Sequence, residues 1–579
     1  MKISLLGNKI AIKLQPGDDF ATTIKKIKTH LAPYEYDPQT HLWLTTKMNL
    51  LVFEQIFQNE KIYYEPEVLG ILEKQKKYLV KLDQFKNTEY DGKGFINIEL
   101  FKHQRQAVNF MLNMPCSGDF DEQGLGKTLS IIFTLGILFD EKKIDKALVI
   151  CPNTLKYNWE KEIKDFSELK CEVLTGSKEE MAEKISLGSQ IYITNFESLI
   201  VKESKAGSKK KIKQSTIDKN KKFQDLFKGL IDEKTCIVID EAHRIKSGSS
   251  KTSKFLRKMG KLAKYKYALT GTPIANKPED IFYLAMFLDG GNLLGTNYFQ
   301  FLKQYCILGN GFSEYAVVGY KNLDKLRFLV SLFSIRRLKK DVLDLPEKIF
   351  EDRIIETSNE HIGFYNKLKA GILQKIKEDG EVKNVKACLI RLIQGASNPI
   401  LLDENCEIES GKVRELDALL EEHIEESGNK VIVWTNFVEN FPYLVERYKK
   451  YNPVFINGSV STEQRQANVL EFQNNENIKL IICNPQACRE GLTLTASNIA
   501  IYLDRTNNMV DYLQSTDRIH RIGQTKTCFI INLICRSTID EIVTNNIFRK
   551  HSLAQYVQGD TKSIEKQISD EELLELALK

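Results

Sequence analysis

Short apolar runs alternate with amphipathic stretches in two separate parts of this 579-residue chain. In the first part, from Phe95 to about residue 285, the clearest runs lie at 147–150, 191–193 and 236–239. Short apolar runs that end in polar or turn-forming residues are typical of buried parallel strands, and amphipathic stretches are typical of the helices that cover them. The pattern therefore predicts an α/β domain with a parallel sheet.

The same alternation returns late in the chain, with apolar runs at 430–434, 480–483, 499–503 and 528–533. Between the two parts, residues 285–410 show mostly helical and irregular patterns and no comparable strand candidates. At about 100–200 residues per domain, the length also indicates several domains. We therefore expect two α/β units separated by a helical insert.

Composition and cysteine spacing exclude several classes of protein. With 42% hydrophobic and 28% charged residues, the chain has the composition of a globular protein. Its longest nearly uninterrupted apolar run, 129–139, has 11 residues, whereas a membrane helix needs about 20. The N-terminus lacks the apolar stretch of a signal peptide, so we expect a cytoplasmic protein, neither membrane-bound nor secreted. The lysine- and isoleucine-rich composition favours a bacterial or phage source. The 11 cysteines form no CxxC pair, which predicts free buried thiols rather than disulfides or a zinc site.

A lysine-rich stretch interrupts the first α/β unit. Residues 201–222 contain nine lysines and two acidic residues, a local charge of +7 in a chain whose net charge is +6. The stretch lacks apolar periodicity, which indicates an exposed loop. It is either a solvated insert or a segment that contacts nucleic acid.

A glycine-rich segment, DEQGLGKT, precedes a strongly apolar helical stretch. Gly124 and Gly126 lack side chains, which allows backbone N–H groups to close around phosphate oxygens at the start of a helix. Lys127 is placed to reach the β- and γ-phosphates of ATP, and the Thr128 hydroxyl to ligate Mg²⁺. The general pattern has glycine where this chain has Asp121, so a glycine-rich turn before a buried helix is the alternative.

Two adjacent carboxylates follow another apolar run. Asp240 and Glu241 come directly after residues 236–239 and begin the sequence DEAH. Carboxylates at the end of a buried strand are costly unless a cation or hydrogen bonds compensate for their charge. Asp240 is placed to hold Mg²⁺ through water, and Glu241 to polarise the water that attacks the γ-phosphate. An acidic N-cap of the next helix is the alternative.

Taken in order, these segments resemble a known family. DEQGLGKT, DEAH and LTGTP at 269–273 are similar to motifs I, II and III of superfamily 2 helicase-like ATPases. DEAHxxK, which ends at Lys246, and LTGTPIAN resemble the SNF2 branch of that superfamily. Gln104, in LFKHQ, resembles the glutamine with which the family reads adenine. Residues 148–159 and 194–199 resemble the motifs that contact the DNA backbone.

The later part of the chain carries the complementary motifs. Residues 431–437 and 490–496 resemble motifs IV and V, and residues 514–524, which end in IGQ, resemble motif VI of the SNF2 family. The insert adds RRLK at 336–339 and LPEK at 345–348, which resemble the RRxK…LPxK segment of SNF2 proteins. The resemblance implies two RecA-like lobes with an SNF2-type insertion between them.

Motif VI supplies the second set of candidate site residues. Arg518 and Arg521 lie three positions apart, so a helix would present both on one face. Planar guanidinium groups suit the charge that develops on a transferring phosphoryl group, although a solvated basic helix face is the alternative. The resemblance adds Gln514 as a nucleotide-binding residue. Because the arginines follow Lys127 by some 390 residues, they can act on the same ATP only if two lobes close over it.

The N-terminal part reads as a separate small α+β unit. The pattern YDPxTxxW, from Tyr36 to Trp43, resembles the HARP-type domain of annealing SNF2 enzymes. The alternative is an α+β domain in which both aromatic rings are simply core residues. The predicted divisions of the chain are an N-terminal accessory domain at 1–94, lobe 1 at 95–285, the insertion at 286–409, lobe 2 at 410–545 and a helical tail at 546–579.

The resemblance implies an ATP- and Mg²⁺-dependent enzyme of the SNF2 type. We expect a DNA-dependent ATPase that translocates on double-stranded DNA and remodels DNA structures or DNA–protein complexes. Double-stranded or branched DNA is the expected partner, with no membrane partner. The alternative is a superfamily 2 helicase that separates DNA or RNA strands, and the sequence identifies no protein partner.

Overall fold

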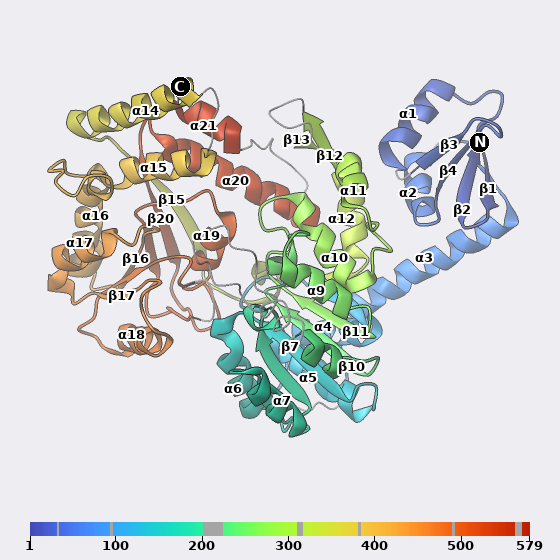
Figure 1. Cartoon of the computed structure of the whole chain (residues 1–579), viewed down its shortest axis with the longest axis horizontal. Coiled ribbons are helices and arrows are strands. Elements are labelled where there is room, and N and C mark those ends of the chain that lie inside the picture. Colours follow the sequence, from blue (N-terminus) through green and yellow to red (C-terminus); the bar gives the residue numbers. More distant parts are fainter. Residues whose placement is uncertain are drawn as a thin grey trace, which may run out of the picture.

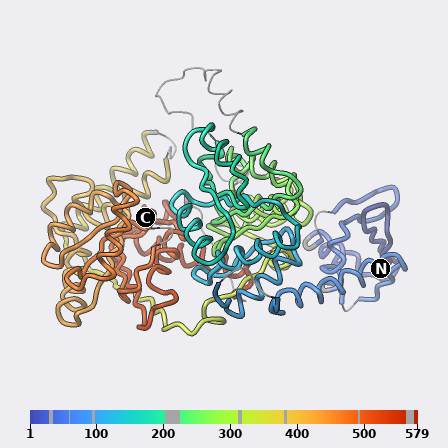
Figure 2. Tube along the Cα trace, turned by 90° about the horizontal axis from the view of Figure 1, so that it is seen from below, coloured from blue at the N-terminus to red at the C-terminus, as the bar shows by residue number. Residues whose placement is uncertain are grey.

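The computed structural model of this chain describes residues 1–31, 34–58, 60–92, 97–200, 224–309, 316–379, 384–488, 492–561 and 570–578. Three bodies follow one another along the molecule: an N-terminal domain at one end, lobe 1 in the middle and lobe 2 at the other end (Figure 1, Figure 2). The lysine-rich segment 201–222, residues 93–94 at the end of the predicted N-terminal domain and residues 490–491 of the motif V segment lie outside the described residues.

The N-terminal domain is built on a five-stranded sheet with the order β3-β4-β2-β1-β5. The β1–β5 pair is parallel and the other pairs are antiparallel. Alternation in KIAIK turns Ile10 and Ile12 toward a core that also contains residues of the two helices α1 and α2. The elements are β1 (Lys2–Leu6), β2 (Lys9–Lys13), α1 (Phe20–His30), β3 (Tyr34–Asp37), β4 (Leu42–Thr46), α2 (Asn49–Ile56), β5 (Tyr63–Tyr64) and α3 (Pro66–Asn87).

Lobe 1 contains a seven-stranded sheet with the order β14-β6-β11-β10-β7-β9-β8, in which every pair is parallel. The three apolar runs of the first α/β unit form β7, β9 and β10, as predicted. Its strands are β6 (Cys116–Asp119), β7 (Lys146–Cys151), β8 (Cys171–Val173), β9 (Ile191–Asn195), β10 (Thr235–Asp240), β11 (Tyr265–Leu269) and β14 (Ser334–Ile335). Its helices are α4 (Lys102–Asn113), α5 (Lys127–Asp140), α6 (Lys156–Phe166), α7 (Lys178–Ser186), α9 (Lys251–Met259) and α10 (Ile281–Asp289).

Lobe 2 contains a six-stranded sheet with the order β15-β20-β19-β16-β18-β17, again parallel throughout. The two parallel sheets confirm the predicted α/β fold of two lobes. The strands are β15 (Lys348–Ile355), β16 (Val431–Trp434), β17 (Val454–Ile456), β18 (Leu480–Cys483), β19 (Ile499–Tyr502) and β20 (Cys528–Cys535). The helices are α16 (Gly411–Leu420), α17 (Asn440–Arg447), α18 (Thr462–Asn474) and α19 (Met509–Thr516).

The expectation that residues 285–410 contain no strands is wrong. β14 and β15 lie in this part of the chain and form an edge of each lobe's sheet, and β12 and β13 form a hairpin. β15 reads KIFEDRII, with Phe350 and Ile354 about half exposed. An edge strand keeps polar residues where a central strand has apolar ones, so a search for apolar runs misses it. The other elements are α11 (Tyr298–Tyr305), β12 (Cys306–Gly309), β13 (Ala316–Tyr320), α12 (Leu323–Ser331), α13 (Lys339–Val342), α14 (Asn359–Asp379) and α15 (Val385–Ser397).

The C-terminal helices pack back onto the rest of the chain. α20 (Ile539–Gln558) contacts α12 and α15, and α21 (Asp570–Leu578) contacts α15 and α20. All eleven cysteines are free thiols. Eight are buried, whereas Cys116, Cys388 and Cys406 are partly exposed, contrary to the expectation that the thiols are buried. Among the described residues, no helix is both long and apolar enough to span a bilayer.

Candidate active site between the two lobes

The glycine-rich segment forms the loop between β6 and α5. Gly124 and Gly126 have φ angles of +84° and +74°, in the left-handed region that glycine adopts without strain. A Cβ atom at Gly126 would lie 2.2 Å from Nε2 of Gln104. α5 begins at Lys127, directly after this turn, so the N–H groups of its first turn face the loop. The predicted glycine-rich turn before a helix is therefore present. We call residues 121–127 the phosphate loop, and their binding of phosphate stays a prediction.

Lys127 lies inside this loop. Its ammonium group donates hydrogen bonds to the backbone carbonyl oxygens of Asp121, at 2.7 Å, and Glu122, at 3.1 Å. The carbonyls hold the cation at the mouth of the loop, where phosphate oxygens could replace them as its partners. Thr128 is half-buried in the first turn of α5.

Asp240 is the last residue of β10 and is partly buried. Its Oδ2 accepts a hydrogen bond from Nε1 of Trp159 at 2.9 Å, and its Oδ1 accepts one from the backbone N–H of Glu241 at 2.8 Å. Burial, and then the neighbouring charge of Glu241, raises the pKa of Asp240 to about 6. A carboxylate in this environment gains from a nearby cation, which agrees with a role in holding Mg²⁺.

Glu241 adopts a left-handed backbone conformation, with φ of 49°. Such a conformation is uncommon for a non-glycine residue and is found disproportionately at functional sites. Its Oε1 accepts a hydrogen bond from Nε2 of Gln123 at 3.3 Å, and its Oε2 lies 3.2 Å from Nδ1 of His243. Burial opposes ionisation, but the hydrogen bond and charge of His243, with the charges of Lys127 and Arg518, lower the pKa of Glu241 overall. Glu241 is therefore held as a carboxylate.

The two arginines of motif VI reach this site from lobe 2. Nη1 of Arg518 and Nη1 of Arg521 donate to the same carbonyl oxygen, that of Leu492, at 3.3 and 3.2 Å. A Cβ atom on Gly124 would lie 3.7 Å from Cβ of Arg521. The structure thus brings lobe 2 against the phosphate loop, although Lys127 and Arg521 are far apart in the sequence.

The expectation that a helix presents both arginines is wrong. α19 ends at Thr516, and residues 517–521 form turns. The carbonyl oxygen of His520 accepts a hydrogen bond from Nζ of Lys339, at 2.9 Å, and Lys339 also forms an ion pair with Asp517. These contacts across the lobes replace the intrahelical bonds that would continue α19.

Several buried polar atoms at this junction have no hydrogen-bond partner among the described residues. Unpartnered buried polar atoms are rare and often mark a site for a bound group. They include Oε1 of Gln123, Oγ1 of Thr272, and both amide atoms of Gln514. Within the described parts of the chain, no three His, Cys, Asp or Glu side chains converge as a ready metal site. Mg²⁺ usually binds one or two carboxylates together with the phosphates of a nucleotide, so the residues present fit Mg²⁺ and ATP bound together.

The segment between β14 and β15 crosses from lobe 1 to lobe 2 beside the site (Figure 2). Nη1 of Arg336 donates to the carbonyl oxygens of Phe120, at 2.6 Å, and Gly271, at 2.9 Å. Arg337 forms an ion pair with Asp121 at 2.9 Å. The paired arginines therefore support the phosphate loop, which explains an acidic residue at the first position of DEQGLGKT.

Two models of protein families match this chain. The SNF2-related domain matches residues 103–399, which is more than half of the chain. This chain belongs to the SNF2-related family. The helicase conserved C-terminal domain matches residues 411–523, so the chain has both domains of a helicase-type ATPase.

Individual relatives agree with the SNF2 assignment. An uncharacterized ATP-dependent helicase of Mycoplasma genitalium is 29% identical over 82% of this chain and 44% of its own length. The SWI/SNF-related matrix-associated actin-dependent regulator of chromatin subfamily A-like protein 1 homolog of Caenorhabditis elegans is 24% identical over 94% of this chain and 74% of its own length. The mouse chromodomain-helicase-DNA-binding protein 1-like is 27% identical over 80% of this chain and 50% of its own length. The chain thus spans about half, or less, of the length of the Mycoplasma and mouse proteins.

Gln104 of this SNF2 chain supports the phosphate loop. Its Oε1 accepts a hydrogen bond from the backbone N–H of Phe101 at 2.9 Å, and its Nε2 donates to the carbonyl oxygens of Leu125 and Gly126 at 3.4 and 3.3 Å. These bonds fix Gln104 beside the loop, and its role in reading adenine stays a prediction.

A cleft of about 240 Å³ lies between the two SNF2 lobes. Its lining combines residues of the two segments expected to contact DNA with a basic helix residue of lobe 2. The lining residues are Asn153, Thr154, Glu197 and Arg244 from lobe 1, and Arg465, Gln486 and Ala487 from lobe 2. The lobe 1 segments expected to contact DNA therefore meet residues of lobe 2 at one cleft.

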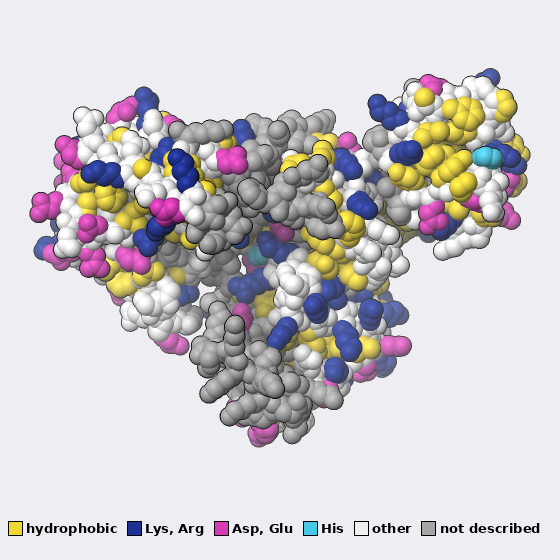
Figure 3. Space-filling view, turned by 45° about the horizontal axis from the view of Figure 1, so that its top comes forward, with side chains coloured by type: hydrophobic (Ala, Val, Ile, Leu, Met, Phe, Trp, Pro, Cys, Tyr) yellow, Lys and Arg dark blue, Asp and Glu magenta, His cyan; other side chains and the backbone are white. Residues whose placement is uncertain are grey.

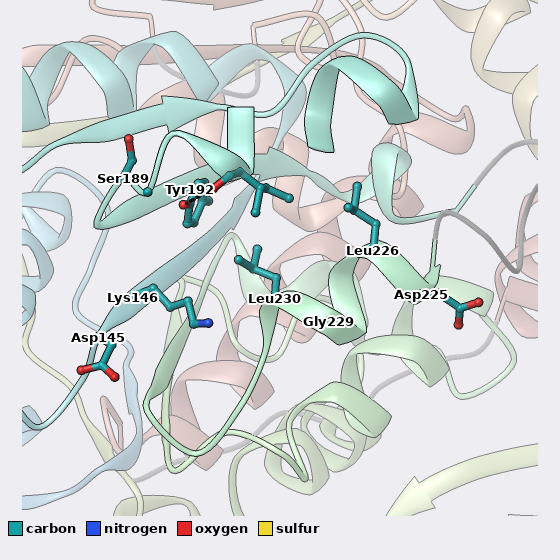
Figure 4. Close-up of a pocket in the computed structure, with 10 residues that line it drawn as sticks. Asp145, Lys146, Ser189, Tyr192, Asp225, Leu226, Gly229 and Leu230 are labelled. Atoms are coloured by element: carbon teal, nitrogen blue, oxygen red, sulfur yellow. Dashed lines mark hydrogen bonds between the residues drawn. The ribbon is translucent and has the colours of Figure 1, made fainter. Parts of the chain in front are cut away.

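A larger hollow, of about 530 Å³, lies elsewhere in lobe 1 (Figure 4). Lys146 and Tyr192, which line it, lie at the amino-terminal ends of β7 and β9. Ligands of parallel α/β sheets bind at the carboxyl ends of the strands, where the phosphate loop and Asp240 lie. The larger hollow is therefore separate from the nucleotide site.

Sequence reasoning missed several residues of the site. Trp159 lies within the predicted segment 148–159, but its hydrogen bond to Asp240 joins residues 81 positions apart. Gln123 lies within the predicted loop, yet nothing in the sequence pairs it with Glu241. The resemblance to RRxK and LPxK marked Lys339 and Lys348, but gave neither a role.

Proposed function

We propose that this SNF2-family chain is an ATPase stimulated by double-stranded DNA, and that it uses ATP hydrolysis to translocate along the duplex. The approach of the lobe 2 arginines to the phosphate loop of lobe 1 carries this proposal. Cβ of Arg521 is 3.7 Å from where a Cβ on Gly124 would lie, and the charge of Arg518 lowers the pKa of Glu241. Groups that bind phosphate, position water and stabilise phosphoryl charge thus come together only when both lobes contribute.

Each residue has a defined role in this proposal. Bound ATP and Mg²⁺ supply the phosphoryl group and neutralise part of its charge. Lys127 would exchange the loop carbonyls for β- and γ-phosphate oxygens, while Thr128 and Asp240 would hold the metal. Glu241, which is held as a carboxylate beside His243, orients the attacking water. Arg518 and Arg521 stabilise the negative charge that develops on the γ-phosphate. Gln514 completes the nucleotide-binding set from lobe 2.

The cleft between the lobes supports DNA as the partner. Arg244 and Arg465 line it from opposite lobes, so a nucleic-acid backbone in the cleft would contact both. A duplex held in this way changes its contacts whenever the lobes open or close, which couples ATP hydrolysis to movement. The name of the mouse relative includes DNA binding, which favours DNA over RNA for this chain.

The test is the rate of ATP hydrolysis by the full chain with no nucleic acid, single-stranded DNA, duplex DNA, forked DNA or RNA. We expect duplex or forked DNA to give the largest stimulation, and the stimulation to fall with salt because phosphate contacts release counterions. A clear preference for RNA would contradict the proposal and favour the strand-separating helicase.

We also propose that the N-terminal domain is a HARP-like reader of DNA structure. Tyr36 and Trp43 face each other across β3 and β4, with ring centroids 4.8 Å apart, and Nζ of Lys28 lies 5.6 Å from the Trp43 ring. Tyr36 is 45% exposed and Trp43 only 7%, so the pair joins the core to the surface. Hydrophobic side chains gather on the face of the N-terminal domain seen in Figure 3, with Lys and Arg side chains near them, a combination that suits stacked bases and phosphates. The match to the worm relative covers 94% of this chain, so it extends into this domain.

A further inference from the structure

A buried cluster of charges joins the two lobes beside the phosphate loop. Lys339, the first residue of α13, is only 2% exposed. Its backbone N–H donates to Oε2 of Glu122, in the phosphate loop, at 2.8 Å. Its Nζ lies 2.9 Å from Oδ1 of Asp517 and donates to the carbonyl oxygen of His520 at 2.9 Å. One residue of the crossing segment therefore contacts the phosphate loop with its backbone and motif VI with its side chain.

Asp517 is shared between two lysines. Nζ of Lys348 lies 3.0 Å from the same Oδ1 atom that Lys339 contacts, and it also donates to Oγ1 of Thr516 at 3.4 Å. Burial alone would raise the pKa of Asp517, but the charges of Lys339 and Lys348 outweigh burial and lower it. Asp517 is therefore ionised and forms ion pairs with both lysines.

This cluster contacts the backbone turns that carry Arg518 and Arg521. Asp517 immediately precedes Arg518, and His520 immediately precedes Arg521. α19 ends just before this point, and the next residues form turns rather than helix. The contacts of Lys339 at both Asp517 and His520 hold these turns in place. Its Cε and Nζ would also lie 3.4 and 3.8 Å from a Cβ at Gly124, so the side chain lies against the phosphate loop.

We propose that the Lys339–Asp517–Lys348 cluster is a positioning device that aims Arg518 and Arg521 at the nucleotide. The cluster acts through the arginines, and Lys339 links their turn to the phosphate loop. Loss of the cluster leaves the phosphate loop and the carboxylates of lobe 1 intact but lets the turn move. This inference rests on the proposed function, because it assumes that the phosphate loop binds ATP and that the arginines act on it.

The test compares the full-length Asp517→Asn variant with the wild type in DNA-stimulated ATP hydrolysis. The variant keeps the shape of the side chain but removes the charge that two lysines share. A displacement of about 1 Å can cost roughly a hundredfold in rate, so we expect kcat to fall by between about tenfold and a hundredfold. We expect ATP affinity, measured by equilibrium binding, to change by less than about threefold. Lys340→Met is the matched control, because Lys340 is the exposed neighbour of Lys339, and its kcat should equal that of the wild type.

Two further variants separate positioning from a general structural role. Lys339→Gln should lower kcat in the same way, and it replaces Asp517→Asn if that variant shows no cooperative thermal unfolding. The double variant Arg521→Ala/Asp517→Asn should have a kcat only slightly below that of Arg521→Ala alone. In that background Asp517→Asn should cost much less than it costs in the wild type, because both changes disable one unit. Fully multiplicative losses would contradict the inference.

The two levels of failure give different results. If the wild type shows no DNA-stimulated ATP hydrolysis, the proposed function itself is wrong. If the wild type is active but Asp517→Asn and Lys339→Gln keep a normal kcat, the proposed function stands and the positioning role is overturned. A loss of ATP affinity equal to the loss of kcat would also overturn it.

Discussion

At the scale of single residues, the side chains expected to act on ATP already have partners within the protein. Lys127 is bonded to two carbonyl oxygens of its own loop, and both motif VI arginines are bonded to the carbonyl oxygen of Leu492. Glu241 is oriented by Gln123 and His243. Binding of ATP therefore exchanges existing contacts rather than ordering mobile side chains, which reduces the entropy that binding must overcome.

Lys127→Ala should abolish ATP hydrolysis. The carbonyl oxygens of the phosphate loop hold the Lys127 ammonium group where it can reach the β- and γ-phosphates, and alanine removes that cation. The measurement is the steady-state rate with duplex DNA. Lys102→Ala, which changes an exposed lysine at the start of α4, is the control and should behave as the wild type. Near-normal turnover by Lys127→Ala would show that this loop is not the nucleotide site.

Glu241→Gln should separate ATP binding from hydrolysis. The amide keeps the shape of the side chain and the acceptor that Gln123 contacts, but it cannot polarise water as a carboxylate does. We expect ATP to bind with near-normal affinity while hydrolysis falls by orders of magnitude. A collapse of ATP affinity would identify Glu241 as a metal-binding or structural carboxylate instead.

At the scale of elements, the turn that begins α5 determines the shape of the phosphate loop. Gly126→Ala should abolish ATP binding for two reasons. The added methyl group would clash with the side chain of Gln104, and residue 126 has a left-handed backbone conformation that alanine adopts only with strain. Gly188→Ala is a matched control, since Gly188 has φ of 72° and open space around the added Cβ. The control should lose stability by about 1 kcal/mol and keep ATP binding. Equal ATP binding by the two variants would contradict this account of the loop.

Most central strands of both sheets could be predicted from the sequence, because strands buried on both faces carry continuous apolar runs. The central strands β6 and β11 were not predicted, because CSGD and YKYAL are not such runs. The edge strand β15 could not be predicted, because three charged residues interrupt the apolar residues of KIFEDRII. The turns at Arg518 and Arg521 were missed for another reason. Local spacing favours a helix there, and the lysines that divert the chain, Lys339 and Lys348, lie far away in sequence.

The candidate site shows the same division. Glycines, Lys127, Thr128 and the DEAH carboxylates could be predicted because each lies in a short local pattern. That Arg521 must approach the same loop followed from its expected chemistry. The bond from Trp159 to Asp240 and the sharing of Asp517 by two lysines could not be predicted, because each joins residues brought together only by the tertiary fold.

At the scale of the whole molecule, the long helix α3 joins the N-terminal sheet to lobe 1 (Figure 1). The helix spans Pro66–Asn87, and Leu82, near its end, is buried in the main core of lobe 1. Leu72, near its start, belongs to the N-terminal core instead. The natural place to remove the N-terminal sheet is therefore before α3, since a cut at residue 94 would also remove a helix that packs on α4.

Deletion of residues 1–64 should leave DNA-stimulated ATP hydrolysis within about threefold of the wild-type rate, because each motif of the ATP site lies downstream. Strand annealing or fork remodelling should fall sharply if this domain reads DNA structure. The rates of ATP hydrolysis and of DNA strand annealing are measured with the same preparation of the truncated protein. Loss of ATP hydrolysis itself would show that the N-terminal domain completes the motor.

The most direct measurement of the two-lobe mechanism is single-turnover ATP hydrolysis by Arg521→Ala, with ATP binding measured on the same protein. Arginine residues in this role contribute about 10³-fold or more to hydrolysis. We expect hydrolysis to fall by about that factor while ATP binding, which depends on the lobe 1 loop, is retained. Hydrolysis at the wild-type rate would contradict the claim that one ATP is acted on by both lobes.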